Sequence, residues 1–560
     1  MILLGLSCYN RESAACLLDD GEVVAAALES SFTRDERHSV FPAQALNFCL
    51  QQGNKTIIDV DYIVIPEKPY IRFERVLVSH IKAFPCSINE FIKSMPSWLE
   101  DRLIIPIKLK KDFAFEGKVL FIKHHLAHVA GAFYSSPFEK SAILTADGSG
   151  EWATLKIATG EGNDINILKE IKYPNSLGLL YAAITNLLGF EPFKDEDKVM
   201  NLSCYGKPNY IDRFKEIVIS KPDGSFMLDE RYFNFLNQSR LYRKKLTSLL
   251  TKERLPGDDI EEVHCDIAAS LQKLVEGILV DMSKRLYEMT KTENLCLSGG
   301  IFNNIKINQR IIEDTPFKDI FIQQTPGNAG TTIGAAKYIY HCILGNQRKF
   351  DVTSPFLGSE YTQIRIKRLL TNRGAEFEEV SPESIPTLAA KMLSDDKLVA
   401  WFQGRTEFGN YGLGNRNILG NPCSTGMKEH LRKKIGLQER VSEFGVLILQ
   451  DKVHNYFEKS LTNVYKSLPF KVKKSMKEKI PSAVQADGTA NVQTLTEGSN
   501  KILFEIVNCF QDITGIPMVL STSFRDANNI LISSPEEAYD TFERMNLDNL
   551  IIGNFIVEKK

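Results

Sequence analysis

The feature that most constrains this chain is a weak internal repeat of a strand, a polar loop and a hairpin. The first copy consists of an apolar stretch, a polar loop and two apolar strands at residues 2–8, 10–12, 13–18 and 22–28. Asp19-Asp20-Gly21 joins those last two strands and is typical of a hairpin turn. The second copy places the same features at residues 141–146, 147–150, 152–159 and 166–172. Two such units predict a duplicated α/β core, although unrelated α/β segments can also produce the pattern by chance.

The rest of the chain predicts two domains. Apolar residues at helical spacing favour a long helix over 264–290, and a short strand then runs into Gly299-Gly300. The charged stretch 210–262 indicates a surface insertion. Pro355 and the polar run before it interrupt the periodicity, so we expect domains at 1–350 and 355–560. Beyond residue 360 the pattern changes to mixed helices and short strands, at 398–402, 446–449, 517–520 and 549–556.

Composition excludes several classes of protein. Among 560 residues, 68 Lys and Arg balance 70 Asp and Glu, so no global field attracts nucleic acid or an anionic membrane. No apolar run approaches the roughly 18 residues of a membrane span, and the first residues lack a basic leader. The ten cysteines form no CxxC pair, which argues against a disulfide framework. We therefore expect a cytoplasmic enzyme.

A histidine cluster is the first candidate for chemistry. His124 and His128 are four residues apart, so in a helix they share one face and can chelate one metal ion. Asp147 follows an apolar strand in an acidic, glycine-containing loop and can complete a mixed nitrogen and oxygen site. The alternative is that two histidines meet by accident.

Glycine loops form the second constellation. Gly148 and Gly150 allow backbone N–H groups to approach a phosphate closely, and Gly299-Gly300 stand where a strand meets a helix. Glycine pairs also mark ordinary turns. In their order along the chain, these loops resemble the phosphate and adenosine loops of the actin, Hsp70 and sugar-kinase ATPases (the ASKHA group). This resemblance implies an ATP site in a duplicated actin/Hsp70-like domain.

Longer motifs carry a more specific resemblance. They are HHLAHVAGAF (124–133), ILTADGSGEWAT (143–154), NSLGLLYAAIT (175–185), DKVMNLSCYG (197–206), LCLSGGIFNNIKINQRI (295–311), TPGNAGTTIGAA (325–336), GRTEFGNYGLGNRNIL (404–419), DGTANVQTL (487–495), STSF (521–524) and SSPEEAYDTF (533–542). In this order the motifs resemble the O-carbamoyltransferase family that includes nodulation protein NodU and the cephamycin and tobramycin O-carbamoyltransferases. The resemblance spans almost the whole chain.

The resemblance implies two catalytic domains. The first is similar to the metal-containing, ASKHA-like protein that attaches threonylcarbamoyl to tRNA, and the second is similar to the α+β YrdC fold. In this family the second domain joins carbamoyl phosphate to ATP, releasing pyrophosphate and forming carbamoyladenylate. The first domain then passes the carbamoyl group to an acceptor hydroxyl, and enclosure protects the adenylate from water.

The resemblance also assigns residues. It implies that a divalent metal, Fe²⁺ by resemblance with Mg²⁺ as a further ion, is held by His124, His128, Asp147 and Asn328. It implies that ATP is held by Gly148, Ser149, Gly150, Gly299, Gly300 and Asn304. It implies catalytic roles for Lys198, Arg405, Arg416 and Ser523. Two departures stand out in the first domain: Asn328 replaces an aspartate of the family, and Asn10-Arg11-Glu12 contains no histidine where the family has one. Glu36 stands where the family has a basic residue.

The second domain departs further from the family. Arginines of three family motifs are absent at Asn410-Tyr411, Val441-Ser442-Glu443-Phe444 and Asn491, while Ser521 begins the altered STSF segment. Because arginine holds phosphate oxygens by bidentate, charge-assisted bonds, serine or asparagine cannot replace it. Four other arginines are candidates to compensate, namely Arg405, Arg416, Arg432 and Arg525.

Three functional hypotheses follow. The leading one is an ATP-dependent O-carbamoyltransferase of specialised metabolism, such as antibiotic biosynthesis, acting on a small-molecule acceptor. The second is a divergent enzyme that performs another nucleotide-dependent transfer or condensation with a less anionic donor. The third is a catalytically silent partner of an active paralogue. A homo-oligomer is compatible with each.

Overall fold

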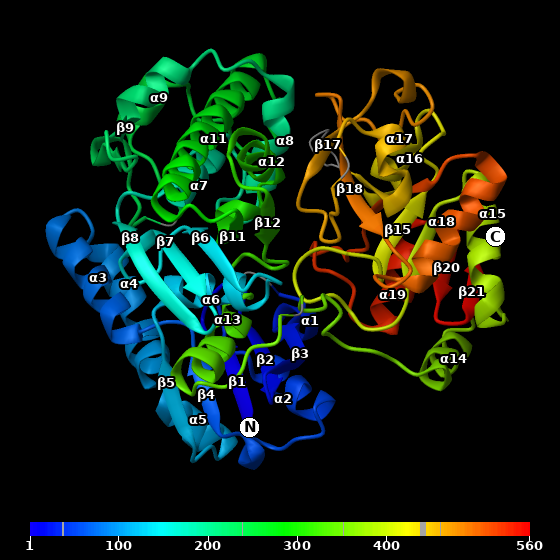
Figure 1. Cartoon of the computed structure of the whole chain (residues 1–560), viewed down its shortest axis with the longest axis horizontal. Coiled ribbons are helices and arrows are strands. Elements are labelled where there is room, and N and C mark those ends of the chain that lie inside the picture. Colours follow the sequence, from blue (N-terminus) through cyan, green and yellow to red (C-terminus); the bar gives the residue numbers. More distant parts are fainter. Residues whose placement is uncertain (36–38, 238, 351, 437–443, 460, 560) are drawn as a thin grey trace. The chain divides into compact units, whose positions relative to one another are not determined.

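The structure is a computed structural model that describes residues 1–35, 39–237, 239–350, 352–436, 444–459 and 461–559 (Figure 1). It divides into two compact units. The N-terminal unit comprises Met1–Glu29 and Glu36–Thr353, and the C-terminal unit comprises Ser30–Asp35 and Ser354–Lys560. The short helix α1 (Ser30–Thr33) therefore packs with the C-terminal half of the sequence.

The N-terminal unit contains two five-stranded sheets, and the first follows the first copy of the repeat. Its strand order is β3-β2-β1-β4-β5. The strands are β1 (Ile2–Ser7), β2 (Ala14–Asp19), β3 (Glu22–Leu28), β4 (Tyr62–Ile65) and β5 (Lys118–Phe121). β1, β2 and β3 form an antiparallel meander, and β4 and β5 continue parallel to β1. Asp20 and Gly21 have φ of 46° and 86°, as the tight hairpin between β2 and β3 requires.

The second sheet repeats this topology. Its order is β12-β11-β6-β7-β8, with β6, β7 and β8 antiparallel and β11 and β12 parallel to β6. The strands are β6 (Lys140–Ala146), β7 (Ala153–Glu161), β8 (Asp164–Lys172), β11 (Asn294–Ser298) and β12 (Asp319–Ile322). The duplicated α/β core predicted from the repeat is thus confirmed, and the N-terminal unit is a mixed α/β unit.

Two helices, α6 (His124–Tyr134) and α13 (Thr331–Lys337), connect the cores of the two sheets. Ala127 and Ala335 pack with β1 and β2 in one buried cluster, whereas Val129 and Phe133 pack with β6 and β7 in another. A Cβ atom on Gly334 would lie 2.0 Å from the carbonyl oxygen of Ala127, so the helices approach closely only because that residue is glycine. Figure 1 shows both helices beside the sheets. This packing fixes the histidine-bearing face of α6.

Further helices surround the second sheet. The long helix predicted over 264–290 is confirmed by α11 (Glu262–Thr290), which packs against α7 (Leu177–Leu187), α8 (Glu196–Leu202) and α12 (Ile305–Asp314). The stretch 210–262 forms α9 (Ile211–Ile217), the hairpin of β9 (Val218–Ser220) and β10 (Phe226–Leu228), and α10 (Lys244–Leu249). Phe214, Ile217 and Leu246 in this stretch are fully buried, so it contributes its own apolar contacts.

The C-terminal unit is built on a nine-stranded sheet of order β13-β21-β20-β14-β15-β19-β16-β18-β17. These strands are β13 (Phe377–Glu379), β14 (Val399–Phe402), β15 (Arg416–Gly420), β16 (Gly445–Leu449), β17 (Pro469–Lys471), β18 (Thr489–Leu495), β19 (Met518–Ser523), β20 (Asn549–Ile552) and β21 (Phe555–Glu558). The helices are α14 (Gln363–Asn372), α15 (Ile385–Ser394), α16 (Met427–Ile435), α17 (Val453–Tyr456), α18 (Lys501–Thr514) and α19 (Pro535–Met545). Over the residues that the structure describes, no helix is long and apolar enough to cross a membrane.

Candidate functional site

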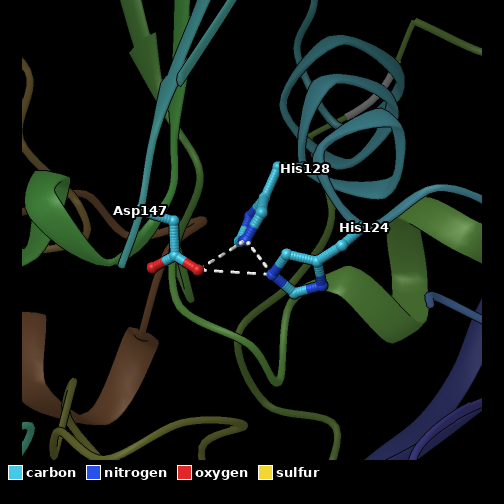
Figure 2. Close-up of side chains that lie close together, drawn as sticks. All are labelled: His124, His128 and Asp147. Atoms are coloured by element: carbon cyan, nitrogen blue, oxygen red, sulfur yellow. Dashed lines mark hydrogen bonds and ion pairs between the residues drawn. The ribbon is translucent and has the colours of Figure 1, made fainter. Parts of the chain in front are cut away.

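Two histidines of α6 and one aspartate after β6 converge in the N-terminal unit. The Nε2 atoms of His124 and His128 are 3.2 Å apart. Oδ2 of Asp147 lies 3.3 Å from Nε2 of His124 and 3.7 Å from Nε2 of His128. Figure 2 shows the two rings and the carboxylate pointing toward one another. We call these three residues the triad.

Hydrogen bonds on the far side of each ring fix how the triad presents its nitrogens. Nδ1 of His124 lies 3.1 Å from the carbonyl oxygen of Pro66, which can only accept, so Nδ1 carries the proton. Nδ1 of His128 lies 3.1 Å from Oγ of Ser298, whose own proton is donated to Oε1 of Gln323 at 2.6 Å. Both Nε2 atoms therefore face Asp147 and are the ring nitrogens available to a metal ion. Such outer partners are typical of metal-binding histidines.

The protonation states of the triad also suit metal binding. Burial raises the pKa of Asp147, but hydrogen bonds and positive charge from both histidines outweigh it and hold that pKa well below its usual range. Burial lowers the pKa of His128, and the hydrogen bond that Asp147 accepts from it only partly offsets this. Burial also opposes protonation of His124, yet Asp147 and two glutamates raise its pKa. Asp147 is therefore an anion and His128 a neutral donor.

The spacing of the triad fits a divalent metal. All three ligand atoms lie within 4.8 Å of one another. Ligand atoms about 2.1 Å from a common metal stand roughly 3 to 3.5 Å from one another, and the triad atoms are separated by similar distances. Two imidazoles and a carboxylate are a donor set for iron, zinc or manganese. The predicted residues His124, His128 and Asp147 are thus brought together as one candidate metal site.

Glycine loops border the triad. The backbone N–H of Gly300 donates to Oδ1 of Asp147 at 3.1 Å, so this turn touches a candidate metal ligand directly. Gly299 has φ of 107°, and a Cβ atom there would lie 2.1 Å from the carbonyl oxygen of Ala146. A Cβ atom on Gly148 would meet nothing within 4 Å among the described residues. In the loop of Gly148, Ser149 and Gly150, the open space is therefore at Gly148, since a Cβ atom on Gly150 would lie 3.0 Å from Cβ of His124.

Asn304 follows the Gly299-Gly300 turn, at the start of α12. Its Oδ1 accepts from the N–H of Ile307 at 3.2 Å and begins α12, while its Nδ2 donates to Oε1 of Gln272 at 2.8 Å. Asn328 lies between β12 and α13, where its carbonyl accepts from the N–H of Thr331 at 3.2 Å. The N–H of Ala329 donates to Oε2 of Glu12 at 3.2 Å, so a carboxylate contacts the loop in which the family aspartate is lost.

The comparisons with known proteins agree with this arrangement. Residues 2–337 match the family described as "Carbamoyltransferase N-terminus", and residues 390–559 match "Carbamoyltransferase C-terminus". The chain belongs to the carbamoyltransferase family. It is therefore a carbamoyltransferase-family enzyme, and the family resemblance of its motifs is confirmed.

Three relatives illustrate the range of this carbamoyltransferase family. "Uncharacterized protein sll1178" of Synechocystis sp. (strain ATCC 27184 / PCC 6803 / Kazusa) is 34% identical over 100% of this chain and 96% of that protein. Nodulation protein NolNO of Sinorhizobium fredii is 28% identical over 99% of this chain and 79% of that protein. Nodulation protein U of the same species is 27% identical over 71% of both.

Arginines of the C-terminal unit of this carbamoyltransferase are held by protein groups. Arg416 is fully buried, stacks 3.7 Å from the ring centroid of Phe402, and donates to carbonyls that include those of Asn415 at 3.1 Å and Gly404 at 3.0 Å. Arg405 donates to the carbonyl of Leu357 at 2.6 Å. Arg432 pairs with Glu429 at 3.5 Å, and Arg525 donates to the carbonyl of Asn529 at 2.7 Å. These contacts position the loops of this unit.

The remaining predicted residues are Ser523 in the C-terminal unit and Lys198 in the N-terminal unit. Ser523 pairs with Asn417, the neighbour of Arg416, where β15 and β19 run side by side. Oγ of Ser523 accepts from the N–H of Gly412 at 2.9 Å and so orients that glycine-rich loop. In the N-terminal unit, Lys198 pairs with Asp195 at 3.3 Å. Glu36 and the segment 441–443 lie outside the described residues. Near them in sequence, Arg34 pairs with Asp526 at 2.6 Å within the C-terminal unit.

Sequence reasoning missed Lys466. A Cβ atom on Gly445 would lie 3.0 Å from Nζ of Lys466 and 2.8 Å from the carbonyl oxygen of Asn491, one of the positions that lacks a family arginine. Burial lowers the pKa of Lys466 to about 8, against the opposing charge of Glu407. Lys466 belongs to a segment without periodicity, between α17 and β17, so no signal in one sequence identifies it. It is a cation beside a predicted donor pocket.

Proposed function

We propose that this enzyme is an ATP-dependent O-carbamoyltransferase that acts on a hydroxyl group of a small molecule of specialised metabolism. The observation that carries the proposal is the triad of His124, His128 and Asp147 in a chain that matches both carbamoyltransferase regions. In this proposal the C-terminal unit has a YrdC-like role and forms carbamoyladenylate. The N-terminal unit then transfers the carbamoyl group.

The reaction balances with one water molecule. Carbamoyl phosphate, ATP and water give carbamoyladenylate, phosphate and pyrophosphate. The acceptor oxygen then forms a bond to the carbamoyl carbon, the bond from that carbon to the oxygen of AMP breaks, and the acceptor proton passes to a base. AMP is a better leaving group than hydroxide, which is why the adenylate is formed first.

The residues near the triad have distinct tasks in this proposal. His124, His128 and Asp147 hold a divalent metal, with iron suggested by family resemblance. The bound metal supplies a positive charge that polarises the carbamoyl group. In this proposal Gly148 gives a phosphate room to approach its loop, as the open space there supports. The backbone N–H groups of Gly150, Gly299 and Gly300 donate to Ala153, Pro326 and Asp147, so these glycines shape the site instead. Asn328 has no negative charge, so we expect weaker metal binding than an aspartate would give.

The C-terminal unit favours a second candidate, in which the donor is less anionic than carbamoyl phosphate. The observation is that Arg405, Arg416 and Arg525 donate hydrogen bonds to backbone carbonyls of their own unit. Their guanidinium groups are therefore already used where a dianionic donor needs them. Lys466 supports the first candidate because it offers a cation near Asn491.

Pyrophosphate release tests both candidates. The purified protein is loaded with iron and incubated with ATP and a hydroxyl acceptor, with and without carbamoyl phosphate. Release that depends on carbamoyl phosphate, together with a carbamoylated product by mass spectrometry, is expected. Release that occurs only with another carboxylate or carbamate donor would select the second candidate. Failure of any donor to give release, despite bound ATP and metal, contradicts both.

A further inference from the structure

Three arginines gather close to the triad in the N-terminal unit. Arg72 and Arg75 lie on α3 (Pro69–Lys82), directly after β4, and Arg102 comes from the helical segment that follows. Arg72 pairs with Glu67, and it also lies 3.4 Å from Oδ1 of Asn10. Arg102 packs over the ring of Trp98, with 5.2 Å from its guanidinium carbon to the ring centroid.

These arginines have unused hydrogen-bond donors. Nε of Arg72, Nη1 of Arg75 and Nη1 of Arg102 are buried, and none has a hydrogen-bond partner in the part of the chain that the structure describes. Arg75 is only 8% exposed. A buried, unsatisfied donor on a charged group is destabilising and is rare in folded proteins. Three such donors in one region therefore call for a partner with acceptor oxygens.

The charges of this region do not balance. Among the described residues, Arg72 is the only one of the three that forms an ion pair, and its partner is Glu67. Both oxygens of Glu151 accept from the backbone N–H of His124, at 3.0 and 3.2 Å, so that carboxylate is occupied by the start of α6. Burial and the like charge of Arg72 lower the pKa of Arg75 and of Arg102 to about 10. Arg75 and Arg102 therefore remain cations at neutral pH.

A small pocket opens beside the guanidinium group of Arg102. Its lining includes Asn10, Pro66, Glu67 and Arg102. The carbonyl of Pro66 is the group that accepts from Nδ1 of His124, so the pocket and the triad share one wall. Asn10 belongs to the loop in which this chain departs from the family by having no histidine. The pocket is thus adjacent to the candidate metal site.

We propose that Arg72, Arg75 and Arg102 bind an oxyanion group, a carboxylate or a phosphate, carried by the acceptor molecule. The guanidinium fork matches such oxygens in geometry and in charge. The acceptor is therefore an acidic hydroxyl compound, whose anionic end occupies this site while its hydroxyl faces the triad. The assignment to the acceptor rests on the proposed carbamoyl transfer, whereas binding of an oxyanion does not.

Calorimetric titration tests the site without turnover, because metal, ATP and donor are left out. Inorganic phosphate and glycerol 3-phosphate are the probes, and glycerol is the uncharged control. We expect one site for each anion, with affinity at least about tenfold weaker in Arg75→Gln and in Arg102→Gln, since a charge-assisted hydrogen bond contributes roughly that factor. Arg310→Gln is the matched control, because Arg310 forms an exposed pair with Asp314 on α12.

Thermal melting separates ligand binding from a structural role. If Arg75 and Arg102 await a ligand, their glutamine variants melt, without ligand, at or above the temperature of the unaltered protein and lose the stabilisation that phosphate gives. Variants that melt lower and still bind phosphate as the control does would overturn the proposal, as would failure of the unaltered protein to bind either anion. A third outcome is that carbamoyl phosphate displaces bound phosphate and glycerol 3-phosphate does not. That result would assign the site to the carbamoyl donor and overturn the assignment to the acceptor.

Discussion

The arginines of the two units differ in how their hydrogen-bond donors are used. Arg416 in the C-terminal unit gives its Nη donors to backbone carbonyls and to Thr406, and only its Nε has no partner among the described residues. Arg75 in the N-terminal unit is almost as deeply buried and has a donor with no partner in the described structure. Arg416 uses both of its terminal nitrogens to hold its own fold, whereas the terminal Nη1 of Arg75 is left for a ligand. The comparison places the clearest ligand-binding features of this chain in the N-terminal unit.

The largest expected effect comes from the triad. His128→Ala should abolish stoichiometric metal binding, because it removes one of two chelating imidazoles and leaves a weak pair of ligands. Metal content after dialysis is measured by atomic emission, and the fold is checked by circular dichroism. His125→Ala is the matched control, since His125 is a buried neighbour whose Nδ1 contacts Oγ1 of Thr145 at 2.9 Å and is outside the triad. Equal metal content in both variants would show that the triad is not the site.

Arg416→Ala should lower the free energy of unfolding by about 3 kcal/mol, because several buried carbonyls lose a charged donor at once. Urea denaturation followed by fluorescence measures the change. Metal content should be unaffected, since Arg416 and the triad belong to different units.

The Arg416 result also sharpens the comparison between units. Carbamoyl-phosphate-dependent pyrophosphate release should fall in Arg416→Ala, because the loops that it anchors form the predicted donor pocket. A stable variant with unaltered release would remove Arg416 from both the structural and the functional account.

The substitution Asn328→Asp should have a smaller effect than the changes at His128 and Arg416. Asn328→Asp restores the carboxylate of the family and adds a negative charge. Residue 328 belongs to the same loop as Pro326, whose carbonyl accepts a hydrogen bond from the N–H of Gly299. We expect metal affinity to rise about tenfold, or roughly 1.4 kcal/mol, as measured by competition with a chromogenic chelator. Asn346→Asp serves as the control, because Asn346 lies after α13 and away from this loop. Unchanged affinity in Asn328→Asp would show that residue 328 does not act on the metal.

The parts of the fold that rest on local patterns could be predicted from the sequence. The alternation of β1 to β3, the turn at Asp19-Asp20-Gly21 and the periodicity of α11 are local, so the sequence predicts the antiparallel part of each sheet and the long helix. It does not predict β4, β5 or β12. The stretch 549–556 was foreseen as one strand but forms the hairpin of β20 and β21, because Gly553 reverses the chain with φ of 56°. The order of the nine-stranded sheet and the place of α1 depend on pairings between distant segments, which one sequence does not encode locally.

The site shows the same division. The four-residue spacing of His124 and His128 is a helical signal, and the metal hypothesis rests on it. The arginine cluster was missed, although Arg72 and Arg75 are three residues apart on a helix that follows a strand, which is a usable signal. Arg102 joins them only through the tertiary fold. Whether a guanidinium has acceptors for its hydrogen-bond donors depends on the residues packed around it. The sequence therefore does not distinguish Arg416, whose terminal nitrogens are bonded, from Arg75, whose Nη1 is not.

The smallest expected effect concerns Lys466, the C-terminal counterpart of the buried arginines. Its pKa is about 8 in the folded protein, below the ordinary 10.5, so the folded state binds fewer protons than the unfolded state between these pH values. Stability should therefore rise as pH increases from about 8 to 10.5, and below pH 8 the full destabilisation is present. Lys466→Met should remove this rise and stabilise the protein at pH 7 by on the order of 1 kcal/mol. Chemical denaturation at pH 7 to 10 measures it, with Lys471→Met as control because Lys471 is exposed and paired with Glu458. If the two variants show the same pH dependence, burial does not depress the pKa of Lys466, and Lys466 is then no poised charge near Asn491.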